Sequence, residues 1–333
     1  MAYRVDRFNE RDRSLWRALC FVPVWICVAI IPAGIAFFAG AMLAATVEKS
    51  LSMAGSLSWE DLVLNRLRSG MTFHEGWGFV SGELPEFMGK GVMLVALLLV
   101  AKRFYGRRGK TWITSAAKFR TGQYVIGLTG VGVLASFVMI VTGLMDPAGA
   151  YSAALPEGAP LEVGMICMIV LAIVAANAFG EEVLFRGWLM QQVNAFSASP
   201  VLVIGVPALL FGVAHLDLYP PRMLQLIVAG LAFGWAAWRL SGIELAAGAH
   251  AGFNIAINQF QPVRTVQGHE LENLAQQLGH TAQQTQNIAY LSSPTLMDWA
   301  ALIAVAVLPA IVAEAVLTFE RARKSPEDPS GPA

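Results

Sequence analysis

The sequence predicts an all-α, polytopic membrane protein with about eight transmembrane helices. First, 56% of the 333 residues are hydrophobic and only 14% are charged, whereas a soluble domain carries about 25% charged residues. Second, apolar runs close to the length of a bilayer span recur along the chain. Third, basic residues gather in alternate connections between these runs. The formal net charge is zero, so no overall field favours nucleic acid, and the lipid bilayer is the expected surrounding.

Eight apolar stretches are predicted to span the membrane. The first is longer than the apolar core of about 7–15 residues in a signal peptide, so it is interpreted as a spanning helix. The second is shorter than the roughly 20 residues of a span, and we expect it to borrow flanking residues such as Lys102 and Arg103. The stretches cover about Leu19–Ala45, Phe87–Val100, Tyr124–Leu144, Val163 through the acidic pair described below, Pro200–His215, Met223–Leu240, Leu245–Phe260 and Leu296–Leu317.

The distribution of charge predicts the orientation. With eight spans, one side receives the arginine-rich start of the chain, the Lys102–Arg120 loop, the Asn194 region, the Arg239 turn and the basic end at Arg321–Lys324. Short loops rich in lysine and arginine stay in the cytoplasm. We therefore predict a multi-pass protein of the cell membrane with both termini cytoplasmic.

The same reading divides the chain into five parts. They are residues 1–160, with three spans and a polar loop at about 48–86; residues 161–260, with spans four to seven and the candidate catalytic core; residues 261–294, a Gln-rich extramembrane loop; residues 295–318, the last span; and residues 319–333, a disordered tail. The three cysteines lie in apolar stretches, and their odd number indicates no disulfide framework.

Two adjacent carboxylates, Glu181 and Glu182, follow an almost continuous apolar run in the fourth span. Ionisable groups at such depth are costly and by default mark a functional site. Glu182 and Arg186 are spaced i,i+4 with the acid first, the favourable order for a pair on a helix. Glu181 is left without a partner in the sequence, and an unpaired buried carboxylate suits general-base chemistry. The alternative is that all three form an ion network that only fixes helix packing.

Three further polar residues follow in later spans: His215 in FGVAH, and His250 with Asn254 in HAGFN. Each alone could be a residue that hydrogen-bonds between helices. Together with Glu181 they form a sparse set suited to hydrolysis. Glu181 would take a proton from water that His215 helps to hold, and His250 and Asn254 would donate hydrogen bonds to the developing oxyanion.

A metal site is a second interpretation of the same residues. Glu181, His215 and His250 would supply two histidines and one carboxylate, which is a known set of ligands for catalytic zinc. The H-E-x-x-H spacing of helical zinc proteases is absent. A divalent metal therefore stays a candidate cofactor that the sequence does not decide.

The predicted span edges conflict with this convergence. Pro200 to His215 is about 22 Å at 1.5 Å per residue, which separates His215 from Glu181 in depth. The conflict disappears if span four continues through Phe185–Gln191 or if span five runs beyond Tyr219. The apolar sequence VLFRGWLM after the acidic pair favours the first solution.

The three motifs E-E-x-x-x-R, F-x-x-x-H and H-x-x-x-N, in that order in successive membrane regions, resemble the CPBP family. These are the CAAX-prenyl-protease and bacteriocin-processing proteins, also called Abi. The matching positions are Glu181, Glu182, Arg186, Phe211, His215, His250 and Asn254, and the resemblance covers about Val163 to Phe260.

The resemblance implies an intramembrane endopeptidase in which Glu181 is the base and both histidines act on water or on the oxyanion together with Asn254. Both a metal-dependent and a metal-independent mechanism are argued for the family. The expected substrate is a membrane-anchored protein or peptide. A non-catalytic scaffold or a bacteriocin-immunity-type protein with the same fold is the main alternative. A proton- or ion-coupled transporter is less favoured because no internal repeat is visible.

Overall fold

The computed structural model describes residues 8–51, 77–145, 150–151, 160–216, 220–259, 262–263 and 296–324. Within these ranges the regular elements are helices apart from two two-residue strands, β1 (Ala150–Tyr151) and β2 (Pro262–Val263), which pair antiparallel. The predicted all-α class is confirmed.

The helices follow the predicted apolar stretches, with three short segments of other helical geometry between them. The helices are α1 (Leu15–Leu51), α3 (Trp77–Tyr105), α4 (Thr121–Ile126), α5 (Gly132–Met145), α6 (Pro160–Glu182), α7 (Met190–Phe196), α8 (Pro200–Ala214), α9 (Pro220–Leu240), α10 (Glu244–Gln259) and α13 (Leu296–Lys324). The other segments are the 3₁₀ turn η2 (Gly109–Trp112) and the π-helices η3 (Gly127–Val131) and η4 (Val183–Leu189).

Six helical segments of the described chain are long and apolar enough to cross a membrane, so the count of about eight is not confirmed. These segments are Leu15–Ala44, Leu84–Tyr105, Thr121–Val141, Gly164–Phe196, Met223–Leu240 and Ile303–Arg321. The predicted fifth and seventh spans correspond to α8 and α10, which have 15 and 16 residues. At 1.5 Å per residue they reach about 22–24 Å, less than the roughly 30 Å of a hydrocarbon core. Both helices are short, but α10 is buried inside the bundle, whereas α8 has an exposed apolar face.

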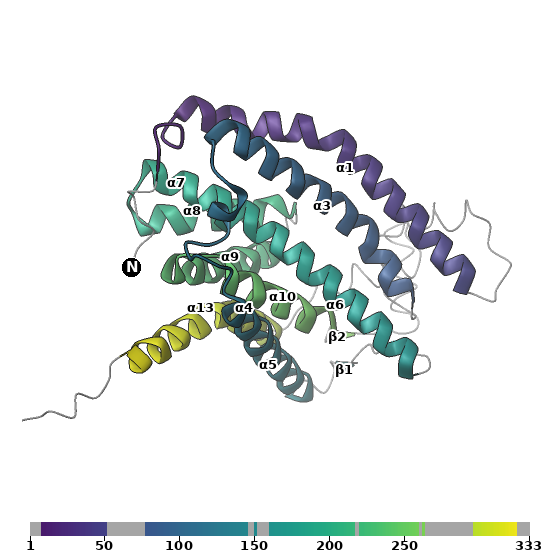
Figure 1. Ribbon diagram of the computed structural model, residues 1–333. Helices are drawn as coiled ribbons and strands as arrows, with labels where there is room; N and C mark the ends of the chain where they lie inside the picture. Colours follow the sequence, from purple (N-terminus) through teal and green to yellow (C-terminus); the bar gives the residue numbers. More distant parts are fainter. Residues whose placement is uncertain are drawn as a thin grey trace, which may run out of the picture.

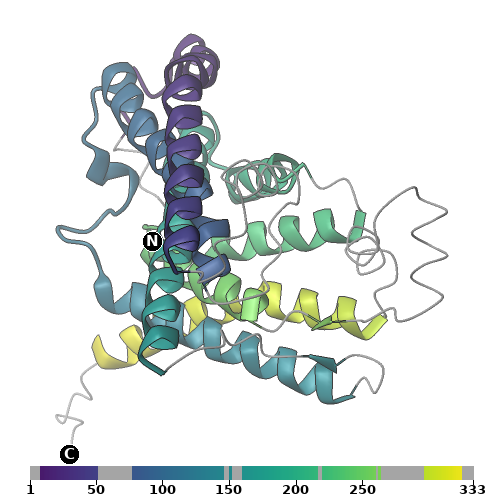
Figure 2. The ribbon, with the colours of Figure 1, turned by 90° about the vertical axis from the view of Figure 1, so that its right-hand side faces the viewer.

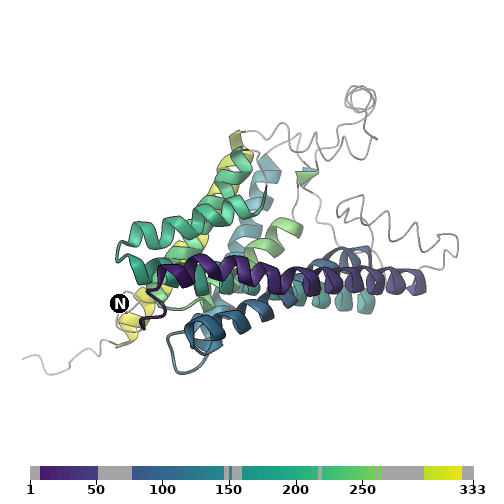
Figure 3. The same cartoon turned by 90° about the horizontal axis from the view of Figure 1, so that it is seen from above.

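Helix α10 lies at the centre of the bundle. It packs against α4, η3, α5, α6, α9 and α13 (Figure 1). The long helices α1 and α3 run side by side, and α3 packs on α6; the two helices follow one side of the molecule when it is seen from above (Figure 3). In Figure 2 α1 (purple) runs steeply across the direction of α13 (yellow). The motif-bearing helices thus lie between the α1–α3 pair and α13.

Small residues let α10 approach its neighbours closely. A Cβ on Gly248 would lie 1.9 Å from the Tyr124 carbonyl oxygen, and one on Gly252 would lie 2.3 Å from that of Leu128. Gly248 and Gly252 form a G-x-x-x-G pair, the spacing that lets membrane helices pack backbone to backbone. His250 lies between the two glycines in the chain, so this contact sets the depth and rotation of a candidate site residue.

Contacts link the Lys- and Arg-rich segments that connect the helices at one end of the bundle. The predicted topology requires these segments to lie on one side. Arg107 pairs with the buried Asp12, and Thr114 forms an isolated β-bridge with Gly242. Gln123, at the start of α4, donates a hydrogen bond to Glu320 near the end of α13. The start of α1, the α3–α4 connection, the α9–α10 turn and the end of α13 therefore share one end. That this end faces the cytoplasm stays a prediction.

At this end Arg120 holds Glu244, the first residue of α10. The guanidinium lies 2.7 Å from the Glu244 carboxylate, which is fully buried, and also donates to the Leu240 carbonyl. Burial raises the pKa of Glu244, but hydrogen bonds from Arg120 and Thr114 and the charge of Arg120 outweigh it, so the pKa lies below its ordinary value.

Several predicted boundaries change. Helix α1 extends to Leu51 and α3 begins at Trp77, so both ends of the predicted polar loop at 48–86 are helical. Helix α13 continues to Lys324 and includes the first residues of the predicted disordered tail. The remainder of both loops and of the tail lies outside the described residues, and the division into five parts otherwise stays a prediction.

Candidate active site

The acidic pair lies where α6 passes into a π-helix. Glu181 and Glu182 are the last residues of α6, η4 follows directly, and α7 continues the same helical path to Phe196. The apolar segment therefore runs from Gly164 to Phe196, which places Glu181 well inside it. Span four therefore continues through Phe185–Gln191, which resolves the predicted conflict between the depths of Glu181 and His215. Single π turns inside helices often occur at functional sites.

Glu182 is held from two sides. Its Oε1 accepts from the Arg186 guanidinium at 2.7 Å, which confirms the predicted i,i+4 pair, and lies 2.9 Å from His250 Nδ1. Both Glu182 and Arg186 have no exposed side-chain surface. Arg186 also donates to the Gly230 carbonyl at 2.9 Å, and its guanidinium carbon lies 4.6 Å from the centre of the Phe211 ring. Glu182 and Arg186 thus tie η4 to α9 and α10 and orient His250.

Because an ionised carboxylate can only accept, the contact with Glu182 requires a proton on His250 Nδ1. The imidazole also stacks on Phe233, with ring centres 4.7 Å apart. These contacts leave Nε2 as the free nitrogen of the ring.

Glu181 has a partner that the sequence did not reveal. Its Oε1 lies 2.8 Å from the ammonium of Lys90 on α3, which also pairs with Glu86 at 2.5 Å. The interpretation of Glu181 as an unpaired carboxylate is therefore wrong. Its Oε2 lies 3.8 Å from His250 Nε2, which is beyond hydrogen-bonding distance, so both atoms keep free capacity toward the cavity.

His215 follows α8 directly and is fixed by its own helix. Its Nδ1 lies 2.7 Å from the Phe211 carbonyl, one turn earlier, and its ring contacts the Phe211 ring edge-on at 4.7 Å. A carbonyl can only accept, so the proton is on Nδ1 and the neutral ring offers Nε2 as an acceptor.

The structure brings the four candidate reacting residues to one cavity. Glu181 from α6, His215 from the end of α8, and His250 and Asn254 from α10 all line a cavity of about 290 Å³. Glu182 and Arg186 do not line it and lie behind it as a buried pair. The predicted set therefore separates into four residues at the cavity and two that support them.

The donor set does not fit a metal ion. Among the described residues, no group of three or more His, Cys, Asp or Glu side chains is arranged to hold one. In addition, the Lys90 ammonium already lies against Glu181, and a second cation beside it would be repelled. The prediction of a metal site at Glu181, His215 and His250 finds no support, and no step below uses a metal.

Sequence reasoning did not identify several further residues that line the cavity, among them Lys90, Asn177, Gln225 and Phe233. Lys90 and Asn177 carried a signal that was overlooked, because each is a strongly polar residue inside an apolar run. Gln225 carried the same signal, because it is an amide in the sixth apolar stretch, whereas Phe233 carried none, since an aromatic residue is ordinary in a packed helix.

The comparisons with known proteins concern the motif-bearing helices. Residues 163–256 match the family model described as type II CAAX prenyl endopeptidase Rce1-like. No curated protein and no solved structure matches the chain. The matched segment contains all three motifs that the resemblance was based on. The match therefore supports the resemblance of this segment to the CPBP family, in its Rce1-like, CAAX-protease type.

Proposed function

We propose that the protein is an intramembrane endopeptidase that hydrolyses a peptide bond in a membrane-associated protein or peptide. One observation carries this proposal: Glu181, His215, His250 and Asn254 come from three helices and line the same cavity. Few other ionisable side chains line that cavity, and the chemistry that this set performs best is the activation of water against a carbonyl.

Glu181 and His215 are the residues that activate the water. Glu181 Oε2 and His215 Nε2 are the free acceptors left by the contacts of Lys90 and of the Phe211 carbonyl. Water donates one hydrogen to each, its oxygen attacks the carbonyl carbon, and Glu181 takes the proton. When the carbon–nitrogen bond breaks, Glu181 returns that proton to the leaving amine.

His250 and Asn254 stabilise the oxyanion that forms meanwhile. The Asn254 amide is a neutral donor. His250 can donate through Nε2 only when both ring nitrogens carry protons, because Nδ1–H is already directed at Glu182. The carboxylates of Glu182 at 2.9 Å and Glu181 at 3.8 Å would balance the positive charge of such a ring.

The test is cleavage of a library of internally quenched peptides with an apolar, membrane-inserted segment. Wild type should cleave some of these peptides, and Glu181→Gln should lower the rate by about 10²–10⁴, as expected for the loss of a general base. Glu314→Gln is the matched control, because it changes a carboxylate on α13 that pairs with Arg239 on α9 and does not line the cavity.

The same cleavage assay with a chelator added tests whether the reaction needs a metal ion. Cleavage should persist in chelator, and cleavage that is lost there and restored by zinc would overturn the metal-free mechanism. A folded wild-type protein that cleaves no peptide would favour the non-catalytic alternative.

A further inference from the structure

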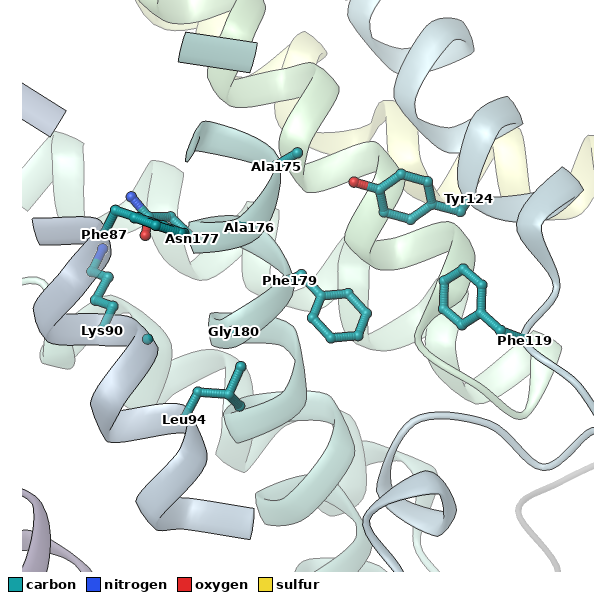
Figure 4. Close-up of a pocket in the computed structure, with 11 residues that line it drawn as sticks. Phe87, Lys90, Leu94, Phe119, Tyr124, Ala175, Ala176, Asn177, Phe179 and Gly180 are labelled. Carbon is teal, nitrogen blue, oxygen red and sulfur yellow. The ribbon is translucent and has the colours of Figure 1, made fainter. Parts of the chain in front are cut away.

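A second cavity adjoins the candidate active site, and its lining is almost entirely apolar. It has a volume of about 340 Å³ and lies between α3, α6 and the start of α4. Figure 4 shows Lys90 and Asn177 together at one side of it, with Phe119 and Tyr124 at the other. Lys90 and Asn177 line both cavities, so they form the polar wall between the apolar cavity and the reacting residues.

Asn177 has hydrogen-bonding capacity that the described part of the chain does not use. Its side chain is 8% exposed, and its Oδ1 finds no partner among the described residues. Leaving a buried acceptor unpaired destabilises a protein, by more than a typical hydrogen bond stabilises it. An unpaired carboxamide inside an apolar helix that lines a cavity therefore indicates a ligand that completes it.

Lys90 does not offer the same capacity. Its ammonium is shared between the carboxylates of Glu86 and Glu181, at 2.5 and 2.8 Å. Asn177 is thus the uncharged polar group of this wall, and an uncharged amide pairs best with another amide, because it offers one acceptor and two donors.

The position of Asn177 matches the spacing of a peptide. It lies one turn before Glu181 on the same face of α6, about 6 Å along the axis. Consecutive residues of an extended chain are about 3.3–3.6 Å apart, so a peptide group two residues from the scissile bond lies about 7 Å from it. A chain that is extended for cleavage inside the membrane loses its helical hydrogen bonds, and its peptide groups need partners there.

We propose that Asn177 is a substrate-binding residue whose carboxamide hydrogen-bonds the backbone of the peptide, about two residues from the bond that Glu181 and His215 attack. The hydrogen bond holds the extended chain along α6 and sets the scissile carbonyl against the reacting residues. This inference rests on the proposed endopeptidase function.

The test combines a variant with altered substrates. Asn177→Leu keeps the shape and removes the carboxamide. Asn194→Leu is the matched control, since Asn194 is buried, its Nδ2 has no partner in the described part of the chain, and it lines neither cavity. The substrate is the library peptide that wild type cleaves fastest. Analogues replace one peptide N–H at a time by an ester oxygen within three residues of the scissile bond.

Asn177→Leu should lower kcat/KM about tenfold on the parent peptide, and Asn194→Leu should not. For one ester analogue, kcat/KM should be about tenfold lower than for the parent peptide with wild type. With Asn177→Leu the same analogue should lower kcat/KM less than twofold, because the variant has already lost the partner of that N–H. The thermal midpoint of Asn177→Leu should equal or exceed that of wild type, whereas a purely structural asparagine would lower the midpoint and leave the ester pattern unchanged.

The inference would be overturned if each ester substitution lowered kcat/KM equally in wild type and in Asn177→Leu. It would also be overturned if no ester substitution lowered kcat/KM of the wild type. The scan with wild type needs no variant, so a poorly folding Asn177→Leu does not remove the test. Cleavage of the parent peptide by Asn177→Leu at the wild-type kcat/KM, while Glu181→Gln is inactive, refutes this inference alone. Absence of cleavage by wild type refutes the proposed function and this inference together.

Discussion

Replacing Arg186 by methionine should destabilise the protein by about 3 kcal/mol, although methionine fills much of the same space. The guanidinium is fully buried and lies 2.7 Å from Glu182. Removing one member of a buried pair costs about 3–5 kcal/mol, because it leaves the other charge uncompensated. The lower end applies here, since His250 still contacts Glu182 and since an unfolded chain in a membrane also finds partners.

Reversible unfolding in mixed detergent micelles measures this change. Glu182→Gln alone should also cost about 3 kcal/mol, and the double variant should cost about 3 rather than 6, so the coupling energy is about 3 kcal/mol, the upper end of the range for contacting residues. Arg239→Met is the control, because its pair with Glu314 is partly exposed and is worth about 1 kcal/mol or less. Additive losses in the double variant, or a loss below about 1 kcal/mol for Arg186→Met, would refute this reasoning.

Four further outcomes are expected. In steady-state assays Lys90→Met should lower kcat about tenfold with little change in KM, because the ammonium orients the proposed base Glu181. Lys90→Arg should recover part of the lost kcat. Equal effects of both variants on KM alone would contradict this. His215→Gln should lower kcat by about 10²–10⁴ and leave the unfolding midpoint unchanged, since the ring is exposed at a helix end. Gly248→Ala should destabilise by about 1–3 kcal/mol in chemical unfolding, because its Cβ would meet a backbone oxygen at 1.9 Å, whereas Gly122→Ala has open space and should not. The pKa of Glu244 is depressed in the folded protein, so its ionised form stabilises the fold above the ordinary pKa of about 4.5, and this stabilisation is lost as the pH falls through the pKa of the folded state. The thermal midpoint should therefore fall less steeply between pH 7 and pH 3 in Glu244→Gln than in wild type.

The supporting pair behind the cavity shows why single motif residues are hard to assign a role from sequence. Arg186 is part of the E-E-x-x-x-R motif, yet the structure puts it among three aromatic rings and a backbone carbonyl, away from the cavity. In the proposed mechanism Arg186 would act on the reaction only through Glu182 and His250. A variant of Arg186 should consequently lose activity and stability together, whereas a variant of His215 should lose activity alone.

Local chemistry in the sequence determined much of this protein. Composition and apolar runs predicted the all-α membrane fold, because the bilayer demands long apolar helices whatever their partners are. Helical spacing predicted the Glu182–Arg186 pair, since that contact is made within four residues of one helix. The motifs predicted the family and the four residues at the cavity, which the family comparison and the shared lining support.

Only the tertiary structure decided what depends on distant segments. Lys90 lies 91 positions before Glu181 and reaches it because α3 packs on α6. The helical path that continues through η4 places Glu181 well inside its span, and the backbone contact of Gly248 with Tyr124 sets the depth of His250. A hydrogen bond between helices depends on where both helices lie, and the packing of small residues that fixes those positions leaves no periodic signal in either segment.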